Sequence, residues 1–170
     1  WLNRGTEPNE SCPLYQEYGI KLKIVIQDDF LAGRAAFLNG DIDVIYCTAD
    51  SWPVECGVES EMMNAGACFF NISNWSRGAD AIVVKNNINN VSDLKGKRIA
   101  TSKGTASHTL LLNVLETSSI SENDVTIYEV EDGVQAANVF RAGKVDACVC
   151  YSPDDQEIES TGLGKVLIST

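Results

Sequence analysis

The sequence predicts an α/β protein of two lobes, each built from a parallel sheet flanked by helices. Its 170 residues are enough for two small lobes, and 44% of them are apolar, which is an ordinary globular composition. Short apolar strands alternate with helical segments along the chain. One phrase also occurs twice, in residues 37–44 and 140–147: a helix end, a glycine, and a strand that opens hydrophobic–Asp–hydrophobic. Two similar lobes are the simplest explanation of this repeat.

Residues 1–78 are predicted to form the first lobe. Apolar and polar side chains alternate over residues 20–27, which indicates a strand. A helix is expected over residues 28–38, followed by a buried strand over residues 42–47. Strand, helix and strand in this order form the unit of a parallel sheet. A short helix is expected within residues 53–65.

Residues 79–170 are predicted to form the second lobe, after a crossover near residues 75–85. Several apolar runs of strand length alternate with two longer helical segments. The strands are predicted at residues 79–85, 97–101, 125–130, 145–151 and 166–168, and the helices after residue 103 and over residues 133–142.

Charge argues against nucleic acid as a partner. The chain carries 24 acidic and 13 basic residues, a net charge of −11. Its densest basic group is only Lys95, Lys97 and Arg98. No apolar run approaches the roughly 20 residues that span a bilayer.

The six cysteines match no zinc pattern, because the chain has no CxxC motif and a single histidine. Cys148 and Cys150 are placed on one face of a strand, a poor geometry for a disulfide between them. The cysteines are expected to be buried free thiols that act as small apolar side chains. A Cys47–Cys68 or a Cys56–Cys68 disulfide is the alternative in an oxidising compartment.

No catalytic set is visible. A Ser–His or Cys–His dyad would have to use the single histidine, and no G-x-S-x-G elbow surrounds a serine. Walker A and GxGxxG loops are also absent from the sequence, so no cofactor and no enzymatic activity are predicted.

Candidate binding residues follow the carboxyl ends of predicted strands, where open parallel sheets bind ligands. The loop before the 103–115 helix offers Gly104, Thr105, Ser107 and His108. The first-turn N–H groups of that helix form a partial positive pole for an anion. The alternative is that Thr105 or Ser107 only caps the helix, and that His108 is a surface residue.

Thr48, Asp50 and Ser51 are the counterparts in the first lobe, at the end of the predicted 42–47 strand. Asp50 or Ser51 can equally cap the helix that follows Pro53.

Two further pairs complete the predicted site. Trp75 and Arg77 lie at the crossover, where Arg77 pairs either with an acidic ligand or with a carboxylate of the hinge. Tyr151 offers a ring on which a ligand can stack, and Asp154 offers an acceptor for a ligand amine. Asp154 can instead open the next helix.

Four segments resemble the solute-binding proteins of ABC importers. They are LYQEYGI at residues 14–20, VSDLKGKRIA at 91–100, KGT at 103–105 and AGKVDA at 142–147. The branch that they resemble serves sulfonates, nitrate and thiamine-precursor pyrimidines. The resemblance implies the type II periplasmic-binding-protein fold, in which two lobes close by a hinge around a solute.

The resemblance implies that the protein captures a small, anionic or polar organic solute outside the cytoplasm and hands it to an ABC permease. The location is the periplasm or the outer face of the cytoplasmic membrane. Against the family's pattern, the chain is expected to lack the first strand and helix of lobe one and the return segment of lobe two. The open sheet position is then filled by another chain, which means self-association, or by a swapped segment, or stays disordered.

Two alternatives stay open. One is a pyridoxal-phosphate-dependent thiamine-pyrimidine synthase, whose cysteine-rich motif is missing here. The other is the ligand-sensing effector domain of a transcription regulator, which requires a helix-turn-helix upstream.

Overall fold

The computed structural model describes residues 5–27, 30–49 and 61–170. The chain divides into two compact units, Trp1–Tyr46 and Cys47–Thr170. Asp50, Ser51 and most of the helix expected within residues 53–65 lie outside the described residues. The predicted lobe boundary at residue 78 stays a prediction.

Among its described residues, the first unit contains the helices α1 (Pro13–Tyr18) and α2 (Phe30–Leu38). Proline opens α1, where its missing N–H costs nothing. Gly19 ends α1 in the left-handed conformation (φ 68°) and donates its N–H to the Tyr15 carbonyl at 2.8 Å. The helix predicted over residues 28–38 is confirmed as α2 over its described residues.

The two strands predicted in this part of the chain are not formed. Residues 20–27 and 42–47 have no strand structure, and their apolar side chains are largely exposed, with Ile26 at 76% and Tyr46 at 70%. Alternating or apolar side chains make a segment suitable for a sheet, but a strand exists only when a second strand pairs with its backbone. No described residue before Asp80 belongs to a strand, so the prediction of a buried parallel strand at residues 42–47 is wrong.

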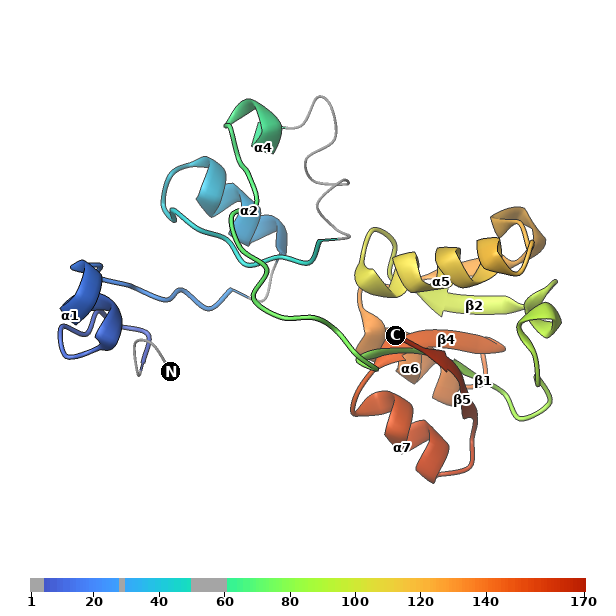
Figure 1. Ribbon diagram of the computed structural model, residues 1–170. Helices are drawn as coiled ribbons and strands as arrows, with labels where there is room; N and C mark the ends of the chain where they lie inside the picture. Colours follow the sequence, from blue (N-terminus) through green and yellow to red (C-terminus); the bar gives the residue numbers. More distant parts are fainter. Residues whose placement is uncertain (1–4, 28–29, 50–60) are drawn as a thin grey trace. The chain divides into compact units, whose positions relative to one another are not determined.

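The second unit holds a five-stranded sheet with helices on both faces (Figure 1). A short helix, α4 (Glu61–Asn64), precedes it. The elements that follow in chain order are β1 (Asp80–Val84), a 3₁₀ turn (Val91–Leu94), β2 (Arg98–Thr101), α5 (Ala106–Thr117), a second 3₁₀ turn (Glu122–Asp124), β3 (Thr126–Glu129), α6 (Gly133–Arg141), β4 (Ala147–Tyr151), α7 (Asp154–Ser160) and β5 (Lys165–Ser169).

The sheet has the order β3-β2-β4-β1-β5 and mixes strand directions. β2 pairs in parallel with both β3 and β4, as predicted, and each connection between them passes through a helix. β1 runs antiparallel to β4 and to β5. The α/β class is confirmed, and the sheet is mixed because the chain enters it through β1 in the opposite direction.

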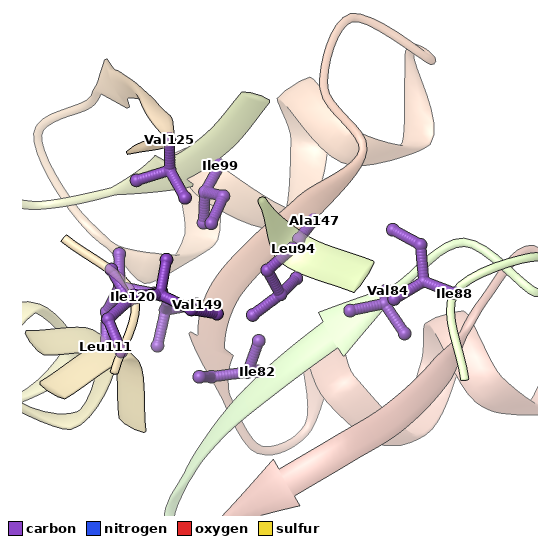
Figure 2. Packing of buried hydrophobic residues seen from close by; sticks show 11 residues of the cluster. Ile82, Val84, Ile88, Leu94, Ile99, Leu111, Ile120, Val125, Ala147 and Val149 are labelled. Carbon is purple, nitrogen blue, oxygen red and sulfur yellow. The ribbon is translucent and has the colours of Figure 1, made fainter. Parts of the chain in front are cut away.

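Two apolar cores hold the helices on the sheet. On one face, α5 packs through Leu111 onto Ile82, Ile99 and Val149 (Figure 2), and Leu115 of the same helix belongs to this cluster. On the other face, α6 and α7 pack onto alternate residues of the same strands, which are Ala81, Val83, Ala100, Cys148 and Cys150. Strands covered on both faces are apolar at nearly every position, which explains the continuous runs in β1 and β4.

The acidic residue of the AGKVDA segment, Asp146, connects the ends of three neighbouring strands. Asp146 accepts hydrogen bonds from Lys85 Nζ at 2.9 Å and from the Arg98 N–H at 3.1 Å. Burial acts to raise the pKa of Asp146, but these two hydrogen bonds outweigh it and the pKa is lowered. Asp146 therefore stabilises the start of β4 between β1 and β2.

Both copies of the repeated phrase form the same helix end. Gly40 (φ 77°) donates to the Phe37 carbonyl at 3.1 Å, and the next N–H donates to Ala36. Gly143 (φ 72°) donates to the Phe140 carbonyl at 2.8 Å, and the next N–H donates to Val139. Each pair of bonds is a Schellman motif, which requires the left-handed conformation that glycine adopts freely.

The residues just before β1 and just after β5 are hydrogen-bonded to each other. The Gly78 N–H donates to the Thr170 carbonyl, and the Thr170 N–H donates to the Asp80 carbonyl at 3.0 Å. β1 and β5 are neighbours in the sheet, so residues far apart in sequence form adjacent strands at the predicted crossover.

None of the described cysteines is joined in a disulfide. Cys12, Cys148 and Cys150 are buried, as expected for small apolar side chains, whereas Cys68 is exposed. Cys47 and Cys68 form no disulfide, and Cys56 lies outside the described residues. Over the part of the chain that the structure describes, no helix has the length and apolar character of a membrane span.

Candidate binding site at the N-terminus of α5

β2 and β4 end at the same edge of the sheet because they run parallel. After β2 the chain turns through residues 102–105 and enters α5. Gly104 has φ 74°, a left-handed conformation that a residue with a Cβ rarely adopts. The turn places the first residues of α5 against β1 at this edge.

The hydroxyl groups of Thr105 and Ser107 are both used within the protein. Thr105 occupies the N-cap position, but its side chain does not cap the helix. Its Oγ1 donates instead to the Ser102 carbonyl at 2.7 Å. Ser107 is buried, and its Oγ donates to Asp80 Oδ1 at 2.8 Å. The first-turn N–H groups of α5, which have no carbonyl partner inside the helix, are therefore the donors that remain for an anion.

Asp80 was missed by reasoning from the sequence. It stands at the head of β1, directly opposite Tyr151 in the β1–β4 ladder. An acidic residue that opens an otherwise apolar strand, DAIVV, is a signal that could have identified it.

His108 lies in the first turn of α5, and its ring is oriented by the loop. The Gly104 N–H donates to His108 Nδ1 at 3.4 Å. A neutral imidazole that accepts at Nδ1 carries its proton on Nε2. That Nε2 atom is buried and has no hydrogen-bond partner among the described residues.

Thr101, the last residue of β2, also has an unsatisfied polar atom. The side chain is fully buried, and its Oγ1 has no hydrogen-bond partner in the described structure. Because side chains alternate along a strand, Thr101 projects to the same face as Ile99, the face that α5 covers. Buried polar atoms are nearly always paired, so the unpaired Oγ1 of Thr101 is unusual. It shows that a polar partner is missing at this end of the sheet among the described residues.

Tyr151 ends β4 with its side chain 37% exposed. Gly133, the first residue of α6, lies against its ring, since a Cβ at position 133 would be 2.6 Å from Tyr151 Cε1. Burial raises the pKa of the Tyr151 hydroxyl, and nearby carboxylates raise it further; these belong to Asp132, Asp154 and Asp80. Tyr151 is therefore partly exposed to solvent, and carboxylates give its surroundings a negative electrostatic potential.

Asp154 is engaged with an arginine. Arg141 Nη2 lies 2.7 Å from Asp154 Oδ1 and 2.8 Å from Glu157 Oε2. The hydrogen bond to Asp154 raises the pKa of Arg141. This ion pair joins the end of α6 to the start of α7, a structural role that competes with the predicted contact to a ligand amine.

The remaining predicted residues are not brought into this cluster. Trp75 is 79% exposed, and Arg77 is exposed. Thr48 is exposed, and Asp50 and Ser51 lie outside the described residues. Their participation stays a prediction. Among the described residues, no group of three or more His, Cys, Asp or Glu side chains is arranged to hold a metal.

Residues 14–167 match the family described as NMT1/THI5 like. The chain belongs to this family. The match covers most of the sequence and confirms the resemblance noted from the four segments.

Named proteins that are similar to this chain point to the same kind of protein. A curated protein of Escherichia coli (strain K12) that is named for the binding of aliphatic sulfonates is 37% identical over 78 residues, which are 44% of this chain and 24% of that protein. The periplasmic aliphatic sulphonate binding protein SsuA from Escherichia coli is 27% identical in sequence, with a TM-score of 0.74 over 92% of this chain and 53% of that one.

The alkanesulfonate-binding protein SsuA from Xanthomonas axonopodis pv. citri, solved with MOPS, is 36% identical, with a TM-score of 0.51 over 54% of this chain and 32% of that one. The chain thus spans about half the length, or less, of these relatives. Similarity to SsuA confirms the predicted periplasmic-binding-protein fold.

Proposed function

We propose that the protein is a solute-binding component of an ABC importer that captures a small organic acid of the sulfonate kind at the N-terminus of α5. The observation that carries the proposal is the uncapped start of α5: Thr105 stands at the N-cap, yet its side chain bonds to Ser102 and leaves the first-turn N–H groups open. The site lies at the carboxyl end of β2, where this class of sheet binds ligands.

The electrostatics of the chain favour such donors. An anion that approaches a protein with net charge −11 meets a repulsive field. Backbone N–H groups at a helix N-terminus attract an anion locally and add no free cation to the surface. His108 accepts the Gly104 N–H at Nδ1, so its Nε2, which has no partner among the described residues, is the ring atom left to donate at this end of the sheet.

We propose binding rather than catalysis, and a location outside the cytoplasm. The relatives that match are named as sulfonate-binding proteins, and one of them as periplasmic. The counterpart surface in the first lobe is the predicted one, Thr48 to Ser51, with Arg77 at the crossover. Closure of two lobes around the solute is the proposed mode of capture.

A pair of threonine variants tests the site. Thr105→Val removes the hydroxyl that anchors the turn before α5, and Thr117→Val removes a similar side-chain-to-backbone bond at the opposite end of the same helix. Isothermal titration with propane-1-sulfonate should show weaker binding in Thr105→Val, because the turn that holds the first-turn N–H groups loses its bond to Ser102, and unchanged binding in Thr117→Val. Equal affinity in both variants would place the solute elsewhere, and an unmodified protein that binds no sulfonate would overturn the proposed function.

A further inference from the structure

A buried hydrogen bond joins the first turn of α5 to the head of β1. Ser107 is 4% exposed, and its Oγ donates to Asp80 Oδ1 at 2.8 Å. The two residues are 27 positions apart in the sequence, so the bond connects two separate elements of the fold. The other four side chains of β1, in the sequence DAIVV, are apolar. Asp80 is therefore the residue of β1 whose side chain can form a hydrogen bond to α5.

The backbone of Asp80 is bonded to the segment through which the chain enters the sheet. The Asp80 N–H donates to Thr170 Oγ1 at 3.4 Å, and the Asp80 carbonyl accepts the Thr170 N–H at 3.0 Å. The Thr170 carbonyl accepts the Gly78 N–H, and the hydroxyl oxygens of Ser76 and Thr170 lie 3.5 Å apart. Hydrogen bonds thus run without a break from Ser76 and Gly78 through Thr170 and Asp80 to Ser107.

A carboxylate is an unfavourable acceptor at this position unless the strength of its bond matters. Burial raises the pKa of Tyr151, and the carboxylates of Asp132, Asp154 and Asp80 raise it further, so three acidic groups lie near one another in a chain of net charge −11. No lysine or arginine pairs with Asp80 among the described residues. An asparagine would accept the same bond without a charge. The carboxylate makes the bond roughly twice as strong and holds the first turn of α5 more firmly.

We propose that Asp80 is a positioning residue that couples the first turn of α5 to the entry segment, residues 76–79. The proposal rests on the proposed function, because it concerns the effect of a solute bound at that turn. A solute that accepts the first-turn N–H groups draws on the same turn that holds Ser107. The displacement reaches Asp80 through the hydroxyl bond, and then Thr170 and Gly78 through the backbone bonds.

The entry segment is suited to receive such a displacement. Hinge motions are absorbed by a few residues at the ends of elements. Gly78 lies two residues before β1 in the left-handed conformation (φ 74°), and glycine leaves that conformation at little cost. Binding at α5 and the conformation of the entry segment then favour each other, because such a coupling is reciprocal.

The response of the entry segment to a solute is the direct test. Propane-1-sulfonate is added to the whole protein until binding is saturated, and the amide resonances of Gly78 and Thr170 are followed by NMR. Both resonances should shift in the unmodified protein. Ser107→Ala removes the bond to Asp80, so these two shifts should become severalfold smaller at saturation, whereas the resonance of Gly104 still shifts. A role in stability alone would lower the melting temperature and leave the two shifts intact.

Three further variants sharpen the test. Asp80→Ala removes the acceptor and should reduce the shifts as Ser107→Ala does. Asp80→Asn keeps an oxygen that accepts from Ser107, and its response should lie between those of Asp80→Ala and the unmodified protein. Ser102→Ala is the matched control: Ser102 is 6% exposed, and its Oγ donates to the Glu131 carbonyl at 2.7 Å, a bond that does not involve Asp80. This variant should keep the full response of the entry segment.

The outcomes separate the coupling from the proposed function. If the unmodified protein binds propane-1-sulfonate while the resonances of Gly78 and Thr170 stay in place, the coupling is wrong and the solute site stands. A full response in Ser107→Ala, or an equal loss in Ser102→Ala, also overturns the coupling. If the unmodified protein binds no propane-1-sulfonate, the proposed function fails and the coupling fails with it. Ser107→Ala and Ser102→Ala decide the question even if Asp80→Ala does not fold.

Discussion

The two copies of the repeated phrase begin alike and end differently. In both, a phenylalanine one turn before the glycine accepts its N–H, and a left-handed glycine closes the helix, at Gly40 and at Gly143. After the first glycine, residues 42–47 form no strand and expose Tyr46. After the second, β4 lies in the middle of a sheet with both faces covered.

The difference shows which parts of a fold are local. A Schellman motif needs only the residues of one helix end, so the same sequence produces it in both places. A strand needs neighbours, and β4 has β1 on one side and β2 on the other. The acidic residue of the phrase differs in the same way: Asp146 bonds to Lys85 and Arg98, whereas Asp43 is exposed.

Hydrogen exchange should show the largest contrast. The amides of Val83 and Val149 belong to central strands, and we expect them to exchange at least about a thousandfold more slowly than those of Val25 and Val44. Exchange followed residue by residue by NMR checks this. Equal protection of Val44 and Val149 would mean that residues 42–47 pair with another strand in solution, and the contrast would be lost.

Matched deletions of the two phenylalanines should give the next largest effect. Phe140 is buried in the core under α6, and its ring lies against Gly164. Phe140→Ala should lower the free energy of unfolding by about 3–5 kcal/mol. Phe37 is only partly buried, so Phe37→Ala should cost less than half as much in the same denaturant titration. Comparable losses would show that the first copy also packs into a cooperative core.

Asp146→Asn and Asp43→Asn form the third pair. Asp146 and Lys85 are each about one-third exposed, so solvent screens their interaction, and we expect Asp146→Asn to cost about 1 kcal/mol and Asp43→Asn close to nothing. The lowered pKa of Asp146 also sets the pH dependence. Its stabilisation should be complete above the usual value of 3.8 and lost as pH falls through the lower folded value.

Thermal unfolding in acid tests the sign of this dependence. The difference in melting temperature between the unmodified protein and Asp146→Asn should shrink as pH decreases below about 4. A difference that grows toward low pH would contradict the role given to Asp146.

Most of the second region was predictable because its signals are local and mutually consistent. Apolar runs of strand length, helical spacing and glycine stops predicted each of β1 to β5 within about two residues. The antiparallel direction of β1 was not predicted, because the side chains of a strand buried on both faces look the same in either direction. The predictions of strands at residues 20–27 and 42–47 were wrong because the residues of a segment do not specify a second strand for its backbone to pair with.

The candidate site was predictable only in outline. The β2–α5 loop was identified from Gly104 and the residues that follow it, and the structure places them together. The roles of the two hydroxyls depend on Ser102 and Asp80, and the second of these comes from a distant strand. Sequence spacing does not reveal such a contact across the sheet, nor the ion pair that engages Asp154.

The adjacent positions of Gly78 and Thr170 have a mechanical consequence. Both lie at the same end of the antiparallel β1–β5 pair. A force that separates these two residues acts across the ladder and opens its hydrogen bonds one at a time, like a zipper, instead of shearing them together. The sheet should therefore yield at low force when it is pulled from these two points in an optical trap, even though an apolar core covers each of its faces.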